Sequence, residues 1–186
     1  MPSDTLSATV RLKEFDLEKL DVDLGKELYS FASLKVHDSE AAVDLNWEPP
    51  ALSGIDPAHW ALSNIEIAID SVFYQGKDIS ATISELSAEE RSGISLSVKG
   101  MLESDSLRVL IPQLLMQTAY SKMELSAQVP WNAISEQAEE SMRVMLHGSI
   151  GKDDIRIAGG KAVEPIMLRY PNRPITLLAD VEGNFS

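Results

Sequence analysis

The chain has 186 residues, which suits one domain or one elongated module better than two domains. Its 16 basic and 29 acidic residues give a formal net charge of −13, which opposes binding to nucleic acid or to anionic lipid surfaces. The absence of cysteine excludes disulfides, thiolate metal sites and cysteine nucleophiles. Apolar residues make up 44% of the chain and aromatic residues only 6%, so we expect the packing to be mainly aliphatic.

We expect neither end of the given sequence to be a natural terminus. No apolar run approaches the roughly 18 residues that a membrane-spanning helix needs. The start, Met1–Asp4, lacks the basic and apolar regions of a signal peptide. Because a strand pattern runs almost to the last residue, we expect a segment excised from a longer protein that carries its targeting signal elsewhere.

The dominant pattern along the chain is the alternation of apolar and polar residues. It is clearest where Ile65, Ile67 and Ile69 alternate with polar neighbours. Since successive side chains of a strand point to opposite faces, such segments bury one face and expose the other. The pattern predicts a mainly all-β, antiparallel protein, shaped as an elongated β-groove or a flattened sandwich. The other alternating segments are Ala8–Leu12, Ala41–Trp47, Ile79–Ile83, Ile94–Val98, Leu107–Ile111, Met123–Val129, Met142–Leu146, Ile155–Ile157 and Ile175–Val181.

Helical signals are few, and one or two short helical turns are expected. Asp56–Trp60 predicts a capped turn, with Asp56 as the cap and Pro57 at the first helical position. Two further candidates are a short helix at Trp131–Met142 and a helical turn or loop at Asp16–Leu24. No layer of helices follows from them.

Turn residues suggest how the chain is divided. Residues 1–186 are expected to form a single β-rich module, in which Pro49–Pro50 and Ser53–Gly54 leave residues 1–50 open to being a separate first unit. Glycines at strand ends are predicted to form turns. These glycines are Gly76, Gly93, Gly100, Gly148, Gly151, Gly159, Gly160 and Gly183.

The search for chemistry predicts no enzyme, no catalytic residue, no metal site and no cofactor. His37, His59 and His147 each stand alone, outside any metal-ligand spacing. The segment Gly148–Asp154 fails as a phosphate-binding loop because Lys152 is followed by Asp and no helix pattern comes after it, so it is interpreted as a β-turn. Gly159–Lys161 is interpreted in the same way.

Acidic pairs are interpreted as turn and surface chemistry. Neighbouring residues of a strand face opposite sides, so pairs such as Glu89–Glu90 and Asp153–Asp154 do not form a two-carboxylate site. Asp38–Glu40 and Glu103–Asp105 are predicted to be hairpin or loop tips.

An ordered series of short motifs resembles the N-terminal half of TamB/AsmA-type translocation and assembly module proteins. The resemblance covers about residues 30–186 and rests on the order of the motifs, since each motif alone is weak. The motifs are Gly54–His59, Leu62–Ile67, Ile69–Tyr74, Glu89–Ile94, Ile111–Pro112, Thr118 with Ser121, Gly148–Ile155, Tyr170–Ile175 and Val181–Asn184.

The resemblance implies a fragment of a long periplasmic protein, anchored in the inner membrane by a helix outside this chain. Such proteins are thought to form a curved β-sheet with an apolar concave face that bridges the periplasm. They are implicated in moving phospholipid and in assembling outer-membrane β-barrel proteins. Phospholipid acyl chains and outer-membrane assembly proteins are therefore the expected partners, with no enzymatic activity.

The residues and the resemblance leave alternatives open. One aliphatic face fits an apolar groove, and it equally fits a closed core packed against a second sheet. A scaffold module that binds protein through a sheet edge, or associates with its own copies, is the competing class. The candidate groove residues are Ile65, Ile67, Ile69, Ile94, Leu96, Val98, Leu125 and Ala127.

Overall fold

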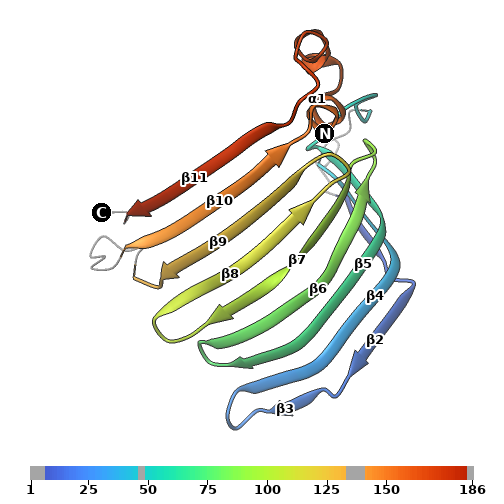
Figure 1. Ribbon diagram of the computed structural model, residues 1–186. Coiled ribbons are helices and arrows are strands. Elements are labelled where there is room, and N and C mark those ends of the chain that lie inside the picture. The colour runs from blue at the N-terminus through green and yellow to red at the C-terminus, as the bar shows by residue number, and fades with distance from the viewer. Residues whose placement is uncertain (1–6, 46–48, 133–140, 184–186) are drawn as a thin grey trace, which may run out of the picture.

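The computed structural model describes residues 7–45, 49–132 and 141–183, and most of them belong to one curved antiparallel sheet (Figure 1). The all-β, antiparallel prediction is confirmed. The strands are β1 (Ser7–Arg11), β2 (Glu14–Glu18), β3 (Asp21–Asp23), β4 (Leu28–Asp44), β5 (His59–Gln75), β6 (Asp78–Glu90), β7 (Ser95–Ser104), β8 (Arg108–Gln117), β9 (Lys122–Pro130), β10 (Met142–Ile150) and β11 (Ile175–Gly183), and the helix is α1 (Lys152–Met167).

The sheet is a simple meander over most of its width. From β4 to β11 each strand pairs with the next one in the sequence, and the sheet of 11 strands is not closed. The first three strands all pair with β4, along its outer edge. The described strands thus form a single layer that includes the strands of residues 1–50, and no second sheet faces it within residues 7–45, 49–132 and 141–183.

Bulges in the long strands keep the apolar side chains on one face of the sheet. Each bulge inserts an extra residue at a defined place in a strand. Asp38, Asn64 and Ser71 have positive φ values of 45°, 51° and 57°. Each lies where the register between neighbouring strands shifts. A bulge adds a residue to one strand and bends it, so the next apolar side chain returns to the same face.

Few side chains are fully buried in this single layer. The buried apolar residues are Val36, Val98, Pro130 and Met167, whereas the buried polar residues are more numerous. Most apolar side chains of the strands are half-buried instead, as Val144 and Leu146 are in β10. The described part of the chain therefore has no conventional interior, and its stability depends on strand pairing and on contacts between neighbouring side chains. The buried polar residues are Ser33, Ser39, His59, Glu90, Ser121 and Asp154.

The helix α1 corrects the largest error of the sequence interpretation. Ile155 and Ile157 were predicted to form a strand, with β-turns at Gly148–Asp154 and Gly159–Lys161. Instead Gly148–Ile150 belong to β10, and Lys152–Met167 form a helix. Asp153 and Asp154 lie in the first helical turn, where negative charge is favourable. At Gly160 the helix is kinked, with φ 53° and ψ −142°, so neither half is long enough to show a helical pattern in the sequence.

Three smaller predictions were also wrong. Asp16–Leu24 was predicted to be a helical turn or loop, but most of it lies in β2 and β3. Gly100 and Gly148 lie inside β7 and β10, not in turns. The segment Asp38–Glu40 lies inside β4 rather than at a loop tip.

The other helical candidates have different outcomes. Pro57 and Ala58 form a turn that leads directly into β5, and the side chain of Asp56 accepts a hydrogen bond from the Ala58 N–H at 3.0 Å, as expected of a cap. The helix expected at Trp131–Met142 falls mainly on residues 133–140, which lie outside the described residues, as does Trp47.

Candidate functional site

The predicted groove residues lie on β5, β7 and β9, except one. Ile65, Ile67 and Ile69 are on β5, Leu96 and Val98 on β7, and Leu125 and Ala127 on β9. Ile94 precedes β7, where its carbonyl oxygen accepts the Glu90 N–H at 2.8 Å.

The strand register places four of these side chains in two rows that cross the sheet, because directly opposed residues of an antiparallel pair share a face. They are Ile67, Val98, Ile69 and Leu125. We call the side of the sheet that carries these rows the aliphatic face. The first row is Phe15, Val36, Ile67, Leu86, Val98, Met116, Met123, Gly148 and Leu177. The second row is Leu17, Leu34, Ile69, Ile83, Gly100, Leu114, Leu125, Leu146 and Ala179.

The aliphatic face extends over the whole width of the sheet. Neighbouring strands lie about 4.8 Å apart, so a row running from β2 through β4 to β11 is about 38 Å long. Its side chains shield one another to different extents: Val98 is only 8% exposed, whereas Phe15, at the edge, is 56% exposed. No further layer of the described residues covers this face.

Two glycines in the rows permit a close approach of neighbouring strands. A Cβ atom added to Gly148 would lie 2.4 Å from the Lys122 carbonyl oxygen and 2.7 Å from the Met123 Cα atom. One added to Gly100 would lie 2.5 Å from the Gln113 carbonyl oxygen. Only glycine fits at such positions, where the backbone of the next strand takes the space of a side chain.

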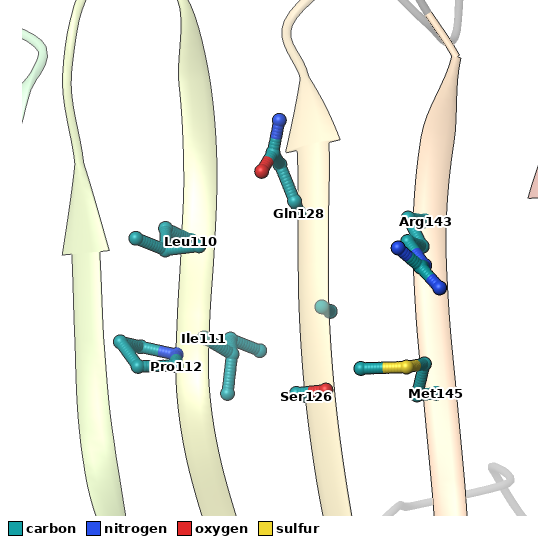
Figure 2. A pocket seen from close by; sticks show the side chains of 8 residues that line it. Leu110, Ile111, Pro112, Ser126, Gln128, Arg143 and Met145 are labelled. Carbon is teal, nitrogen blue, oxygen red and sulfur yellow. The ribbon is translucent and has the colours of Figure 1, made fainter.

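The opposite face mixes polar and apolar side chains and carries small hollows rather than a continuous apolar row. Figure 2 shows one of them, of about 290 Å³, bordered by side chains of β8, β9 and β10. It lies beside Pro112, where the register between β8 and β9 shifts. Arg143 is the charged residue of its lining and lies 3.5 Å from Asp180. The lining is too mixed to indicate a ligand.

Two histidines contact carboxylates at hydrogen-bond distance. His37 Nδ1 lies 2.5 Å from Glu66 Oε2, between β4 and β5. The Asp38 N–H, and after it His37, lower the pKa of Glu66. Together these contacts hold the bulge at Asp38 in place, which is a structural role.

The second histidine contact fixes the connection before β5. His59 Nδ1 lies 2.9 Å from Asp56 Oδ2, and the same carboxylate accepts the Ala51 N–H at 2.8 Å. The pKa of the Asp56 carboxyl falls to about 2. The hydrogen bond from the Ala51 N–H lowers it most, and the contact with His59 comes next. No group of three or more metal-ligating side chains occurs in the part of the chain that the structure describes.

A buried polar cluster that the sequence did not reveal joins α1 to the sheet. The Asp154 carboxylate accepts hydrogen bonds from the hydroxyls of Thr118 and Ser121. Ser121 Oγ in turn accepts the Gly151 N–H at 3.0 Å. Thr118 and Ser121 stood out as one motif and Gly151–Asp154 as part of another, but only the fold brings the two together.

Neither the search for a membrane-spanning helix among the described residues nor the comparisons with known proteins gave a match. None of the described helical residues forms a helix long and apolar enough to cross a membrane. No family model matches the chain, and neither a curated protein nor a solved structure matches it.

Proposed function

We propose that this chain is a non-enzymatic segment of a periplasmic β-groove protein that serves lipid transport and outer-membrane biogenesis. The observation that carries the proposal is the aliphatic face, which extends across the sheet without a covering layer among the described residues. The resemblance of the motif series to translocation and assembly module proteins supplies the location and the biological role. Its parent protein is then anchored in the inner membrane.

Acyl chains are suitable ligands for such a surface because both are apolar. Each buried CH₂ group contributes about 0.8 kcal/mol, so a chain of about sixteen carbons gains on the order of 10 kcal/mol when fully covered. The rows run perpendicular to the strands. Each row is interrupted by only one residue without an apolar side chain, Gly148 in the first row and Gly100 in the second. A continuous apolar path suits a ligand that moves along the sheet.

The test is native mass spectrometry of the purified chain, followed by solvent extraction and lipid analysis. Phospholipid in near-stoichiometric amount is expected with the wild type and is lost in Ile67→Asp, which places a charge within the first row. Ala68→Asp is the matched control, because Ala68 is the next residue of β5 and pairs with Lys35 and Glu85 on the opposite face. Circular dichroism confirms that both variants fold.

Two outcomes would contradict the proposal. A lipid-free mass together with no uptake of added phospholipid would mean that the aliphatic face is covered in solution. Equal loss of lipid in Ile67→Asp and Ala68→Asp would mean that lipid adheres without a specific face.

A scaffold function through a sheet edge is the second candidate, favoured by the edge of β11. Among the described residues β11 pairs only with β10, so its outer backbone groups are open to another strand. Leu178 on this strand is 81% exposed. If the edge mediates association, light scattering detects a dimer of the wild type and a monomer of Leu178→Lys, whereas the lipid content is unchanged.

A further inference from the structure

The helix α1 and the turn after it differ in charge from the rest of the molecule. Residues 152–173 contain five basic and three acidic residues, within a chain whose formal net charge is −13. One of the three acids, Asp154, is buried and accepts hydrogen bonds from the hydroxyls of Thr118 and Ser121. The surface of this segment is therefore locally cationic.

Three cationic side chains from separate parts of the chain line one cleft of about 350 Å³ beside α1. Arg91 comes from the turn between β6 and β7, and Arg156 and Lys161 come from the two halves of α1. The hydroxyl residues Ser53 and Ser92 also line the cleft.

The cleft has a fixed shape because the connection between β4 and β5 packs backbone to backbone against α1. The Ile55 N–H donates to the Ala158 carbonyl oxygen at 2.8 Å. A Cβ atom on Gly160 would lie 2.7 Å from the Ser53 carbonyl oxygen, and one on Gly54 would lie 3.0 Å from that of Ala158. These glycines allow the two walls to lie in contact.

The hydrogen-bond donors of the cleft exceed the acceptors that its neighbours provide. Arg156 Nη2 lies 3.2 Å from Asp153 Oδ1, and Arg91 Nη2 lies 3.8 Å from Asp56 Oδ2. A guanidinium group has five N–H donors, so these contacts leave donors free on both arginines. Lys161 has no ion-pair partner, and Ser92 Oγ no hydrogen-bond partner, within the described ranges.

We propose that this cleft binds a phosphate group through Arg91, Arg156 and Lys161. Planar guanidinium groups suit the oxygens of a phosphate, and an ammonium group adds a compact charge. Glu164 lies in the same lining and opposes the anion, which sets an upper limit to the affinity. The phosphate belongs either to a lipid headgroup or to a soluble compound. The proposal does not rest on lipid binding by the aliphatic face.

The test uses the whole chain and two probes. Isothermal titration calorimetry with inorganic phosphate measures the site itself, and the double variant Arg156→Gln/Lys161→Gln is expected to bind about tenfold more weakly or not at all. Glu164→Gln is expected to bind more tightly, which a merely structural residue would not cause. Arg143→Gln is the matched control, since Arg143 is also an exposed arginine paired with an aspartate.

Vesicle flotation separates the two sources of phosphate. Binding to phosphatidylcholine vesicles that contain phosphatidylglycerol, with competition by inorganic phosphate, assigns the site to a lipid headgroup. Binding of inorganic phosphate without vesicle binding assigns it to a soluble phosphate compound. The proposal is overturned if neither probe binds, or if Arg143→Gln weakens binding as much as the double variant does.

Discussion

The aliphatic face and the helix end of the sheet are built on opposite principles. By the helix end we mean α1 together with residues 49–59, 90–94 and 118–121, which include the connections beside it and the ends of the strands that they join. The aliphatic face is apolar and only half-buried, with Val36 and Val98 as its buried members. The helix end contains the buried polar residues His59, Glu90, Ser121 and Asp154.

The difference shows that the two regions obtain their order from different interactions. On the aliphatic face the order comes from strand pairing, and the side chains remain accessible to a ligand. At the helix end, directed hydrogen bonds and close backbone contacts replace apolar packing. We therefore expect substitutions in the sheet to lower stability by disturbing the packing of neighbouring strands. At the helix end we expect them to lower stability by leaving buried polar groups unpaired.

The largest effect is expected where a side chain is forced between two strands. Gly148→Val places a Cβ atom 2.4 Å from the Lys122 carbonyl oxygen, and we expect a loss of about 3 kcal/mol in the free energy of unfolding. Urea denaturation measures it. At Gly183, also on a strand, nothing lies within 4 Å of an added Cβ atom. Gly183→Val should therefore have little effect, and equal losses would refute a close approach at Gly148.

The next effect is expected at the helix end. Asp154→Ala leaves the hydroxyls of Thr118 and Ser121 without their acceptor, and we expect a loss of about 2 kcal/mol. The control is Asp153→Ala, because Asp153 forms an exposed ion pair with Arg156, and its loss should stay below about 1 kcal/mol. Hydrogen exchange should show faster exchange in α1 of Asp154→Ala alone, and unchanged exchange would contradict the anchoring role.

A smaller effect is expected within the aliphatic face. Val98 is 8% exposed and Val181 is 48% exposed, on β7 and β11 respectively. Val98→Ala should cost about 1.5 kcal/mol, and Val181→Ala about half of that, since each buried CH₂ contributes about 0.8 kcal/mol. Thermal unfolding of the two variants compares them directly. A larger cost at Val181 would indicate that a partner covers β11 in solution.

The smallest effect concerns pH and Asp56. Its pKa falls to about 2, chiefly because the carboxylate accepts the Ala51 N–H and next because of His59. In the unfolded chain an aspartate has a pKa of about 3.9, so the stabilisation is complete above that pH and is lost as the pH falls towards 2. Asp56→Asn should therefore lose less stability than the wild type between pH 5 and pH 2.5, as measured by urea unfolding. An unchanged pH dependence would refute this contribution.

The sequence predicted the strands well because their signal is local. The alternation at Ile65, Ile67 and Ile69 is enough to place a strand and to separate its two faces. It does not contain the register, which depends on bulges such as those at Asn64 and Ser71. Seven of the eight candidate groove residues lie on β5, β7 and β9, but the continuous rows emerge only from the pairing of the strands.

The helix end was mostly missed because its determinants are distant in the sequence. Asp154 meets residues of the turn between β8 and β9, and Gly160 meets Ser53. Glycines have several uses, and both Gly100 and Gly148 were interpreted as turn residues although they permit close packing of strands. A proline and two adjacent glycines hid α1, since these residues rarely occur inside helices.

The two margins of the sheet also differ in how readily they accept another strand. On the β4 side the margin is broken into three short strands, and Arg11, Lys13, Lys19 and Lys26 lie along it or in its breaks. Short interrupted strands and lysines discourage edge-to-edge pairing. On the other side β11 is nine residues long, uninterrupted and without a basic residue. The sheet is thus polarised, with one protected margin and one receptive margin, and its growth by further strands is favoured in a single direction.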